Sequence, residues 1–343
     1  MTRALRFLVA AICAVLAAPL FISQALAGTC SITGASVTSI SPSSSPSIGT
    51  YTSPTALSPV SVTVNLTVAV TLGGGGTHNC NGGVAFYRTT SATGTLTRSG
   101  GGSTIPYALT TTGGTNVISL SGSTPANGQF AFFTSNVTTG NTSFSASGTF
   151  TLQGNPTGSP LSGNYSDTNL SVIVFNSSGS GGSVQGSVFA ATGTSPTITG
   201  AVSTSCSIVT GSLQNASQVI GVNGVGQTTG MSTAMPQFSI TCNNSSTVSL
   251  TSANSAVTRG GVLKSALPAI SNFRNKINYS ASINGGAGAV TLNTATASTA
   301  SGTFNAASVT SLATTVTLTP ETSTVPLQYG SYADKLTITV TPN

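Results

Sequence analysis

Pro160–Asp167 reads PLSGNYSD, and Pro326–Asp334 reads PLQYGSYAD. Both stretches fit the pattern P-L-x(1,2)-G-x-Y-x-D, and each precedes an alternating apolar segment, Leu170–Phe175 or Leu336–Val340. Because Asp side chains hydrogen-bond nearby backbone groups in turns, the repeated acids indicate a structural turn before the last strand of each copy. The repeated motif residues are Gly163, Tyr165 and Asp167 in the first copy and Gly330, Tyr332 and Asp334 in the second.

Two further repeats lie upstream of this motif. Cys30-Ser31-Ile32 recurs as Cys206-Ser207-Ile208, 176 residues later, and Ile105-Pro106-Tyr107 recurs as Ile277-Asn278-Tyr279 before a Gly-rich turn. A β-solenoid would repeat about every 20 to 30 residues, much less than the period seen here. The sequence therefore predicts two homologous domains.

Each copy is predicted to be all-β. Val60–Val68 places its apolar residues on one face only, as a half-buried strand does. A one-sided strand needs a second sheet to cover it, so a β-sandwich is favoured over an isolated sheet. The 343 residues include only nine Lys/Arg and three Asp/Glu, too few for the solvated faces of long helices. The 38% hydrophobic content argues against a disordered chain.

The N-terminus has the three regions of a secretory signal peptide. Arg3 and Arg6 precede the apolar run Phe7–Ile22, and Gln24–Ala27 ends in small residues. Later apolar runs are too short for a spanning helix, so the product is expected to be exported and not held by a transmembrane segment. The predicted division is a signal peptide at 1–27, an N-terminal domain at 28–195 and a C-terminal domain at 196–343.

Four cysteines remain after the predicted cleavage, an even number that suits disulfides in an exported chain. They allow three pairings, of which the local one, Cys30–Cys80 and Cys206–Cys242, places one bridge in each half. Cys80 beside His78 is a competing metal site, but zinc usually takes four ligands and the chain has one His and few acids. Disulfides are therefore favoured, and no cofactor or metal is expected.

The opening C-S-I, the central I-x-Y and the terminal G-x-Y-x-D resemble the spore coat protein U domain, found in pilins of archaic chaperone-usher pili of Gram-negative bacteria. Two copies in one exported chain resemble the two-domain tip adhesin of such pili. The resemblance implies two tandem immunoglobulin-like, pilin-type sandwiches of a domain type that lacks its last strand, and here the C-terminal one is expected to lack it. Such a domain is completed first by a periplasmic pilus chaperone and then, after passage through the outer-membrane usher, by a donor strand from an adjacent pilin subunit.

The residues between the two copies predict how the first one is completed. Val184, Val188 and Ala190 have even spacing within a predicted strand near 183–191, which we expect to close the first domain from within the chain. The alternative is that Ser177–Ser205 is a flexible linker. Only Gly28 and Thr29 precede the first repeat after cleavage, and little follows the last strand. The chain is therefore expected to accept a donor strand in its C-terminal domain and not to donate one.

Other chemistry is disfavoured. The basic residues are too scattered for a nucleic-acid interface. Gly224–Gly230 lacks the helix and the acid of a dinucleotide-binding loop. A Ser-His-Asp site would have to combine His78 with an acid of the repeated turn motif, and Glu321 is the only other acid. We therefore predict no catalytic residues and no enzyme activity.

The predicted function is that of a pilus tip subunit that mediates adhesion to abiotic or host surfaces and biofilm formation. Few charges mean that contact must rest on apolar area, and the resemblance implies apolar loop tips. Tyr51, Leu57 and Leu96 lie in Ser-, Thr-, Pro- or Gly-rich segments and are the candidate adhesive residues, although a core-facing position is the alternative for each. A carbohydrate-binding adhesin and a secreted spore-coat-U-type structural protein are the alternative functions.

Overall fold

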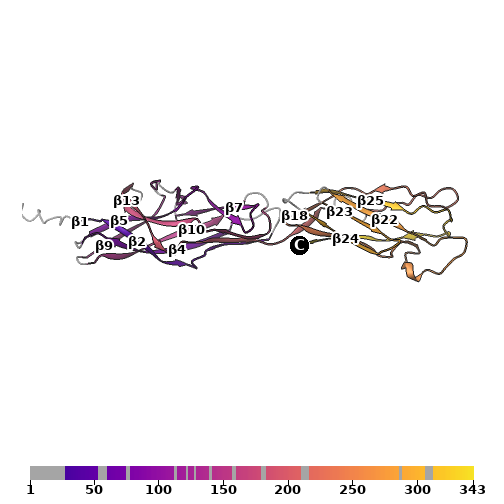
Figure 1. The fold of residues 1–343 in the computed structure, drawn as a ribbon, viewed down its shortest axis with the longest axis horizontal. Coiled ribbons are helices and arrows are strands. Elements are labelled where there is room, and N and C mark those ends of the chain that lie inside the picture. The colour runs from indigo at the N-terminus through magenta and orange to yellow at the C-terminus, as the bar shows by residue number, and fades with distance from the viewer. Residues whose placement is uncertain are drawn as a thin grey trace, which may run out of the picture.

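The computed structural model describes residues 28–52, 60–74, 78–111, 114–120, 123–126, 129–138, 141–156, 160–178, 183–209, 216–285, 288–305 and 312–343. The predicted signal peptide lies outside these residues. The described chain is built from strands, with one 3₁₀ turn, η3, at Lys264–Ala266. This confirms the predicted all-β class. Two β-sandwich bodies lie end to end along the long axis of the molecule (Figure 1).

The first half packs one sheet against another. One sheet contains β1, β5, β8, β9, β12 and β13, and the other contains β2, β3, β4, β6, β7, β10, β11, β14 and β15. The strands are β1 (Gly28–Thr29), β2 (Ile32–Ser41), β3 (Ser47–Tyr51), β4 (Val60–Leu72), β5 (His78–Arg88), β6 (Gly94–Arg98), β7 (Thr104–Thr110), β8 (Ile118–Leu120), β9 (Ala131–Val137), β10 (Ser143–Gly154), β11 (Gly163–Asp167), β12 (Leu170–Ser177), β13 (Val184–Ala190), β14 (Thr192–Gly193) and β15 (Ile198–Val202).

The main core of the first half lies between these sheets. On β4, Val64, Leu66, Val68 and Val70 are buried while Asn65 is exposed, which is the one-sided alternation that the sequence predicted. β4 forms a long antiparallel ladder with β10 and another with β2. Each fully buried aliphatic side chain contributes about 1.5–3 kcal/mol relative to an exposed one.

The second half has a 3₁₀ turn and fewer long strands. Its three sheets contain β16, β17, β18, β22, β23 and β25; β19, β24 and β27; and β20, β21 and β26. The strands are β16 (Cys206–Val209), β17 (Thr233–Ala234), β18 (Phe238–Cys242), β19 (Ser246–Ser252), β20 (Val257–Arg259), β21 (Lys276–Ile277), β22 (Tyr279–Gly285), β23 (Gly288–Asn293), β24 (Thr299–Phe304), β25 (Leu312–Pro320), β26 (Tyr332–Ala333) and β27 (Leu336–Pro342).

The two halves share their strand pairings. The ladders β2–β4, β4–β10, β10–β7, β6–β7, β6–β11 and β5–β12 of the first half are all antiparallel. Their counterparts in the second half are β16–β18, β18–β25, β25–β22, β20–β21, β20–β26 and β19–β27, also antiparallel. The repeats in the sequence therefore correspond to two copies of one sandwich, in which β27 is the equivalent of β12.

Each half contains one disulfide, in the local pairing. Cys30 is bonded to Cys80 on β5, across a separation of 50 residues, and Cys206 to Cys242 across 36 residues. Cys206 and Cys242 are also direct partners in the β16–β18 ladder. In the second half, Cys242 lies at the end of β18. In the first half, the counterpart of β18 is β4, and Cys80 lies in the strand after it, β5. This accounts for the difference between the two spacings.

The boundary between the halves lies later than the sequence suggested. β15 pairs with β11 and β3, and Ile198 and Val202 are buried in the core of the first half. The first half therefore ends at Val202 and not at 195, because the segment that follows β13 still supplies a strand to the larger sheet.

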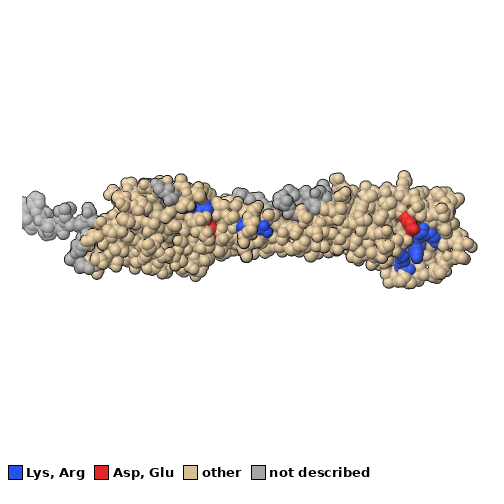
Figure 2. Space-filling model, in the orientation of Figure 1, with Lys and Arg blue, Asp and Glu red and all other residues tan. Residues whose placement is uncertain are grey.

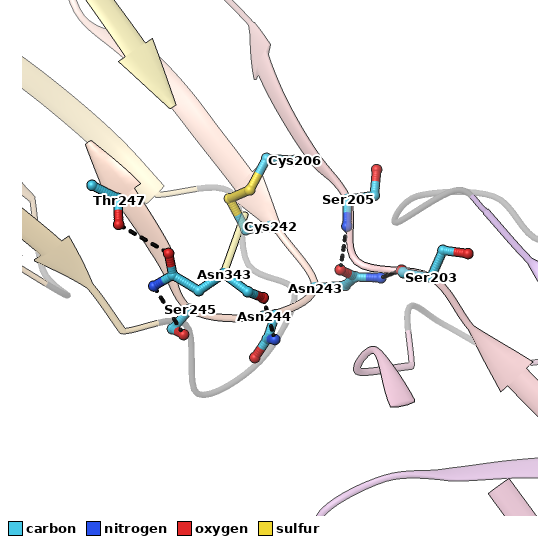
Figure 3. Close-up of a disulfide and its surroundings, with 9 residues drawn as sticks. All are labelled: Ser203, Ser205, Cys206, Cys242, Asn243, Asn244, Ser245, Thr247 and Asn343. Atoms are coloured by element: carbon cyan, nitrogen blue, oxygen red, sulfur yellow. Dashed lines mark hydrogen bonds between the residues drawn. A yellow bond between two sulfur atoms is a disulfide. The ribbon is translucent and has the colours of Figure 1, made fainter. Parts of the chain in front are cut away.

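A buried asparagine holds the junction (Figure 3). The Asn243 side chain is fully buried, its Nδ2 donates to the Ser203 carbonyl at 2.7 Å, and its Oδ1 accepts from the Ser205 amide at 2.8 Å. The Asn243 carbonyl also accepts from the Ser162 amide, 2.9 Å away in the first half. Residues 203–205 are therefore an ordered connection, fixed to both halves.

Candidate functional site

The repeated Asp residues occupy equivalent positions before the last strand of each half, where Asp167 is buried and Asp334 is half-buried. The Tyr107 hydroxyl donates to Asp167 Oδ2 at 2.7 Å, and the Tyr279 hydroxyl donates to Asp334 Oδ2 at 2.6 Å. Asp167 also lies 3.0 Å from Arg88 Nε, whereas Asp334 accepts from the Ser252 hydroxyl at 2.6 Å. The I-x-Y and G-x-Y-x-D motifs thus meet in the fold.

These contacts keep the two tyrosines protonated. Burial, and then the neighbouring Asp167 carboxylate, raise the pKa of Tyr107 far above its ordinary value. Burial, followed by the hydrogen bond to Asp334, does the same to the pKa of Tyr279. Each hydroxyl therefore remains a donor to its carboxylate, and each Asp serves to anchor the turn before the last strand.

A second repeated contact explains the motif glycines. Arg98 Nε donates to the Ser162 carbonyl at 2.6 Å, and Arg259 Nε donates to the Tyr329 carbonyl at 2.9 Å. The next residue in each case is the motif glycine, with φ of 138° at Gly163 and 147° at Gly330. A Cβ at these glycines would lie 3.0 Å and 2.7 Å from the arginine Nε, so both the backbone and the arginine require glycine.

The motif tyrosines complete the same turn. The Tyr165 hydroxyl donates to the Leu161 carbonyl at 2.5 Å, and the Tyr332 hydroxyl donates to the Gln328 carbonyl at 2.7 Å. Each reaches back four residues, as in the tyrosine corner of immunoglobulin-like sandwiches. Sequence reasoning treated Arg98 and Arg259 as scattered charges, because they stand at different distances from the I-x-Y motifs and only the fold shows their equivalence.

The last strand of the first half has a neighbour on both edges. β12 pairs with β5 on one side and with β13 on the other, both antiparallel. Beyond β13, β14 pairs with β2, so residues 184–193 lie between the last strand of one sheet and β2 of the other. The strand predicted near 183–191 is therefore present at the edge of β12 and is not a structureless linker.

The residues of β13 that face the main core are not those predicted. Phe189 pairs with Val174 and packs against the main core, whereas Val188 is 38% exposed and Ala190 is exposed. Val184 packs on a separate small cluster with Phe175. Val184, Val188 and Ala190 do lie on one face of β13, as their spacing predicted. That face, however, lies on the side of Ile173 and Phe175, which belong to the separate small cluster and not to the main core.

The last strand of the second half lacks this second neighbour. β27 pairs with β19 on one edge, and no strand in the described part of the chain pairs with its other edge. Leu336, Ile338 and Val340 pack against the core of the second half but are only half-buried. Their equivalents on β12, Leu170, Val172 and Val174, have relative exposures of 0%, 2% and 0%. We call this side of β27 the open edge.

The predicted adhesive residues do not form a surface. Tyr51 and Leu96 are buried, with exposures of 4% and 0%, because β3 and β6 turn these side chains into the sandwich. Gly154 and Gly200 leave the space that the two side chains fill. Both were therefore wrong as candidates, and the core-facing alternative holds for them. Leu57 lies outside the described residues.

Exposed apolar residues gather instead in the second half. Of the twelve large apolar side chains exposed in the described chain, ten lie there. Many come from segments that meet at the end remote from the first half, where residues 222–228 hydrogen-bond to 323–327 and Arg274 bridges to Leu327. We call this the end surface, and its exposed apolar members include Val225, Leu263, Phe273, Val325 and Tyr329.

Charge is concentrated at the same place. Figure 2 shows most of the visible basic side chains at the far end of the second half, with an acidic side chain beside them. Arg259 and Lys276 lie on β20 and β21, Lys264 lies on η3, and Arg274 Nη2 lies 2.9 Å from Glu321 Oε2. Burial and the nearby Lys276 ammonium lower the pKa of Lys264. The end surface therefore combines four basic groups and one acid with exposed aromatic and aliphatic side chains.

The described residues contain no cluster of metal ligands. No group of three His, Cys, Asp or Glu residues lies close enough there to hold a metal ion. Cys80, the candidate ligand beside His78, is bonded to Cys30. In the same part of the chain, no helix is long and apolar enough to cross a membrane.

Comparisons with known proteins give only distant similarities. No protein-family model and no curated protein matches the chain. Among solved structures, the chain is similar to one of a chaperone–tip adhesin complex described as vital for activation of CFA/I fimbriae biogenesis, with 12% identity, 87% of this chain and 97% of that chain covered, and a TM-score of 0.32.

Two further structures show lower similarity. A protein called BspA_C_mut has 9% identity, with 90% of this chain and 95% of that chain covered and a TM-score of 0.18. The collagen adhesin CNA from S. aureus has 8% identity, with 92% and 97% covered and a TM-score of 0.13. Scores this low carry no argument about function, which has to come from the geometry of the chain itself.

Proposed function

We propose that the chain is the outermost subunit of an extracellular adhesive pilus. Its second half joins the fibre by accepting a strand from an adjacent pilin subunit at the open edge of β27. Its first half, already completed by β13, points outward and contacts an abiotic or host surface, which supports biofilm formation. The observation that carries the proposal is the contrast between β12, with partners on both edges, and β27, which among the described residues has a partner on one edge.

The energetics of the open edge favour a strand partner. Leu336, Ile338 and Val340 are half-buried, and covering each of them more fully would contribute about 1 kcal/mol. Each backbone hydrogen bond made along the edge would add about 0.5–1.5 kcal/mol. Strand addition of this kind gives affinity through the main chain and specificity through alternate side chains.

The first half indicates what such a partner looks like. β13 is the chain's own example of a strand placed on the equivalent edge, and it runs antiparallel to β12. Because an exposed edge is also a template for unwanted pairing, the proposal includes a periplasmic chaperone that covers β27 before assembly and an outer-membrane usher that exchanges it for the pilin strand.

The direct test is to complete the second half as the first half is completed. Residues 178–193 are appended after Asn343 of the full chain, so that the added strand can fold back along β27. We expect the second half to gain several kcal/mol and its thermal midpoint to rise on the order of 5–10 °C. Scanning calorimetry measures the transition.

The control extension carries aspartate in place of the phenylalanine copied from Phe189, so that the added strand cannot place an apolar side chain over the core. It should give no increase. If both extensions leave the midpoint unchanged, β27 does not accept a strand.

The position in the fibre has a separate test. Immunogold labelling of pili with an antibody to the first half should mark fibre ends. Label along the whole length would indicate a shaft pilin, and label on the cell surface without fibres would favour a coat-type structural protein. Loss of attachment to plastic or host cells in a strain lacking the chain tests the adhesive role.

A further inference from the structure

We propose that the end surface is the docking site for the body of the strand-donating subunit, and that it recognises an acidic face of that subunit. This inference rests on the proposed function, since it concerns the partner that completes β27. It adds a second contact, made by side chains and selective for charge, to a contact that is otherwise made by the backbone of one strand.

The polarity of β13 places the partner. β13 is antiparallel to β12, with Val184 opposite Ser177 and Ala190 opposite Ile173. A strand added to β27 in the same sense begins opposite Pro342, at the junction, and ends opposite Leu336. Whatever follows that strand in the donor leaves the edge beside Leu336.

The end surface adjoins that exit. Leu336 is the first residue of β27 and pairs with Ser252, and the Ala253 amide donates to the Lys335 carbonyl at 2.9 Å. Asn254 then joins this corner to η3, because its carbonyl accepts from the Lys264 amide at 2.9 Å. The body of the donor would therefore lie against η3 and the neighbouring loops, and not against the first half.

The composition of the end surface suits a protein contact. Tyr329 is 96% exposed, Phe273 is 48% exposed and Leu263 is 55% exposed. Aromatic residues and arginine are enriched at the centres of protein interfaces and account for most of their binding energy. Large apolar side chains exposed together at one end of a chain mark a surface that another molecule covers.

The charge of the end surface specifies the partner. Glu321 pairs with Arg274 and lies near Lys264, and the second half has five basic residues (Arg259, Lys264, Arg274, Lys276 and Lys335) against two acids (Glu321 and Asp334). A hollow of about 450 Å³ beside Arg274, lined also by Thr322, Ser323, Thr324 and Val325, offers a guanidinium and hydroxyl groups to a carboxylate. An acidic face is the complement of this arrangement, and like charges would be rejected.

The test uses the full-length chain and synthetic peptides. All three peptides carry residues 184–191, the chain's own edge strand. The first has four glutamates after the C-terminal end of this strand. The second has four glutamates before its N-terminal end, and the third has four lysines after its C-terminal end. At 50 mM NaCl we expect the first peptide to bind about tenfold more tightly than the other two, a preference that falls below about twofold at 500 mM NaCl. Fluorescence anisotropy measures the three dissociation constants.

Two chain variants locate the effect. Lys276→Glu combined with Lys335→Glu should reverse the preference between glutamates and lysines at the C-terminal end, because Lys335 directly precedes Leu336 and Lys276 pairs with Thr258, whose other partner is Ala333. Gln153→Glu, on the exposed face of β10 in the first half, is the control and should leave all three dissociation constants unchanged.

The outcomes separate the two proposals. Equal affinity for all three peptides, or tighter binding of the N-terminal glutamate peptide, would overturn the docking inference and leave strand acceptance intact. Failure of every peptide to bind would contradict strand acceptance at β27 and, with it, this inference.

Discussion

β12 and β27 both carry apolar residues at their three core-facing positions, yet these side chains are fully buried in β12 and half-buried in β27. The difference does not come from the core-facing residues, which are apolar in both strands, or from the preceding turn and the neighbouring strand, which are equivalent. It comes from residues 184–193, which follow β12 and have no counterpart on β27 in the described chain. Completion of this sandwich is thus a property of a separate strand, one that the first half takes from its own sequence.

Substitution of Asp167 and Asp334, which precede the two strands, is expected to give the largest difference in stability between the halves. Asp167→Ala would leave Arg88 buried without a counter-charge, at a cost of about 3–5 kcal/mol. Asp334→Ala removes hydrogen bonds to Tyr279 and Ser252 but no ion pair, and should cost about 1–3 kcal/mol. Chemical denaturation of the two variants measures the difference, and equal losses would contradict the assignment of the ion pair as the dominant contact.

Substitutions in β13 test whether this strand stabilises the first half. Phe189→Ser removes the ring that packs over the main core and should cost about 2–3 kcal/mol. Val188→Ser, at the preceding position, is the matched control. Its side chain is 38% exposed, and the substitution should cost less than about 0.5 kcal/mol. Calorimetry should show the loss in the transition of the first half only. A loss at Val188 as large as at Phe189 would mean that the facing of β13 has been misassigned.

A single substitution made in both last strands sharpens the contrast. Val174→Thr buries a hydroxyl and should cost about 2 kcal/mol, whereas Val340→Thr, at a half-buried position, should cost less than about 1 kcal/mol. Appending residues 178–193 should then raise the cost at Val340 towards the value at Val174. Urea unfolding of the parent chain, the two variants, the extended parent and the extended Val340→Thr variant provides the measurement. A cost at Val340 that does not change with the extension would argue against completion of β27.

Alkaline pH should have the smallest effect. Because burial raises the pKa of Tyr107 and Tyr279 in the folded chain, both remain protonated while the unfolded chain ionises above its ordinary value of about 10. The unfolded state then loses protons that the folded state keeps. The free energy of unfolding is therefore unaffected by these tyrosines below pH 10 and falls above it. At pH 11 the loss should be about 1.4 kcal/mol per tyrosine.

Denaturation midpoints at pH 9 and pH 11 measure this loss. Tyr107→Phe should lessen the pH dependence of the first half while leaving that of the second half unchanged. A pH profile that is the same in the variant and the parent chain would contradict the assignment to Tyr107.

The repeated motifs allowed the all-β class and the two copies to be predicted, because P-L-x(1,2)-G-x-Y-x-D and I-x-Y carry turn and core residues whose spacing is local. The position of β13 was also predictable from its alternation. Its facing was not, since β12 is buried on both faces and the pattern alone cannot say which face belongs to the main core.

The burial of the candidate adhesive residues could not be predicted from the sequence. Tyr51 and Leu96 lie in segments whose composition is typical of loops, but the space for them is made by Gly154 and Gly200, more than a hundred residues away in sequence. The end surface was equally hidden, because residues 222–228, 257–264, 273–277 and 321–332 meet only through long-range pairing. Composition is a local property, and burial at these positions depends on distant segments.

The junction has a mechanical consequence. A pull on the first half is transmitted along Ser203–Ser205 and reaches the second half at Cys206, the first residue of β16. There the bond to Cys242 carries the load covalently into β18, so tension cannot peel β16 from its neighbour one hydrogen bond at a time. A subunit anchored through its second half and held by its first would thus bear hydrodynamic drag on a cross-link at the point where the force enters.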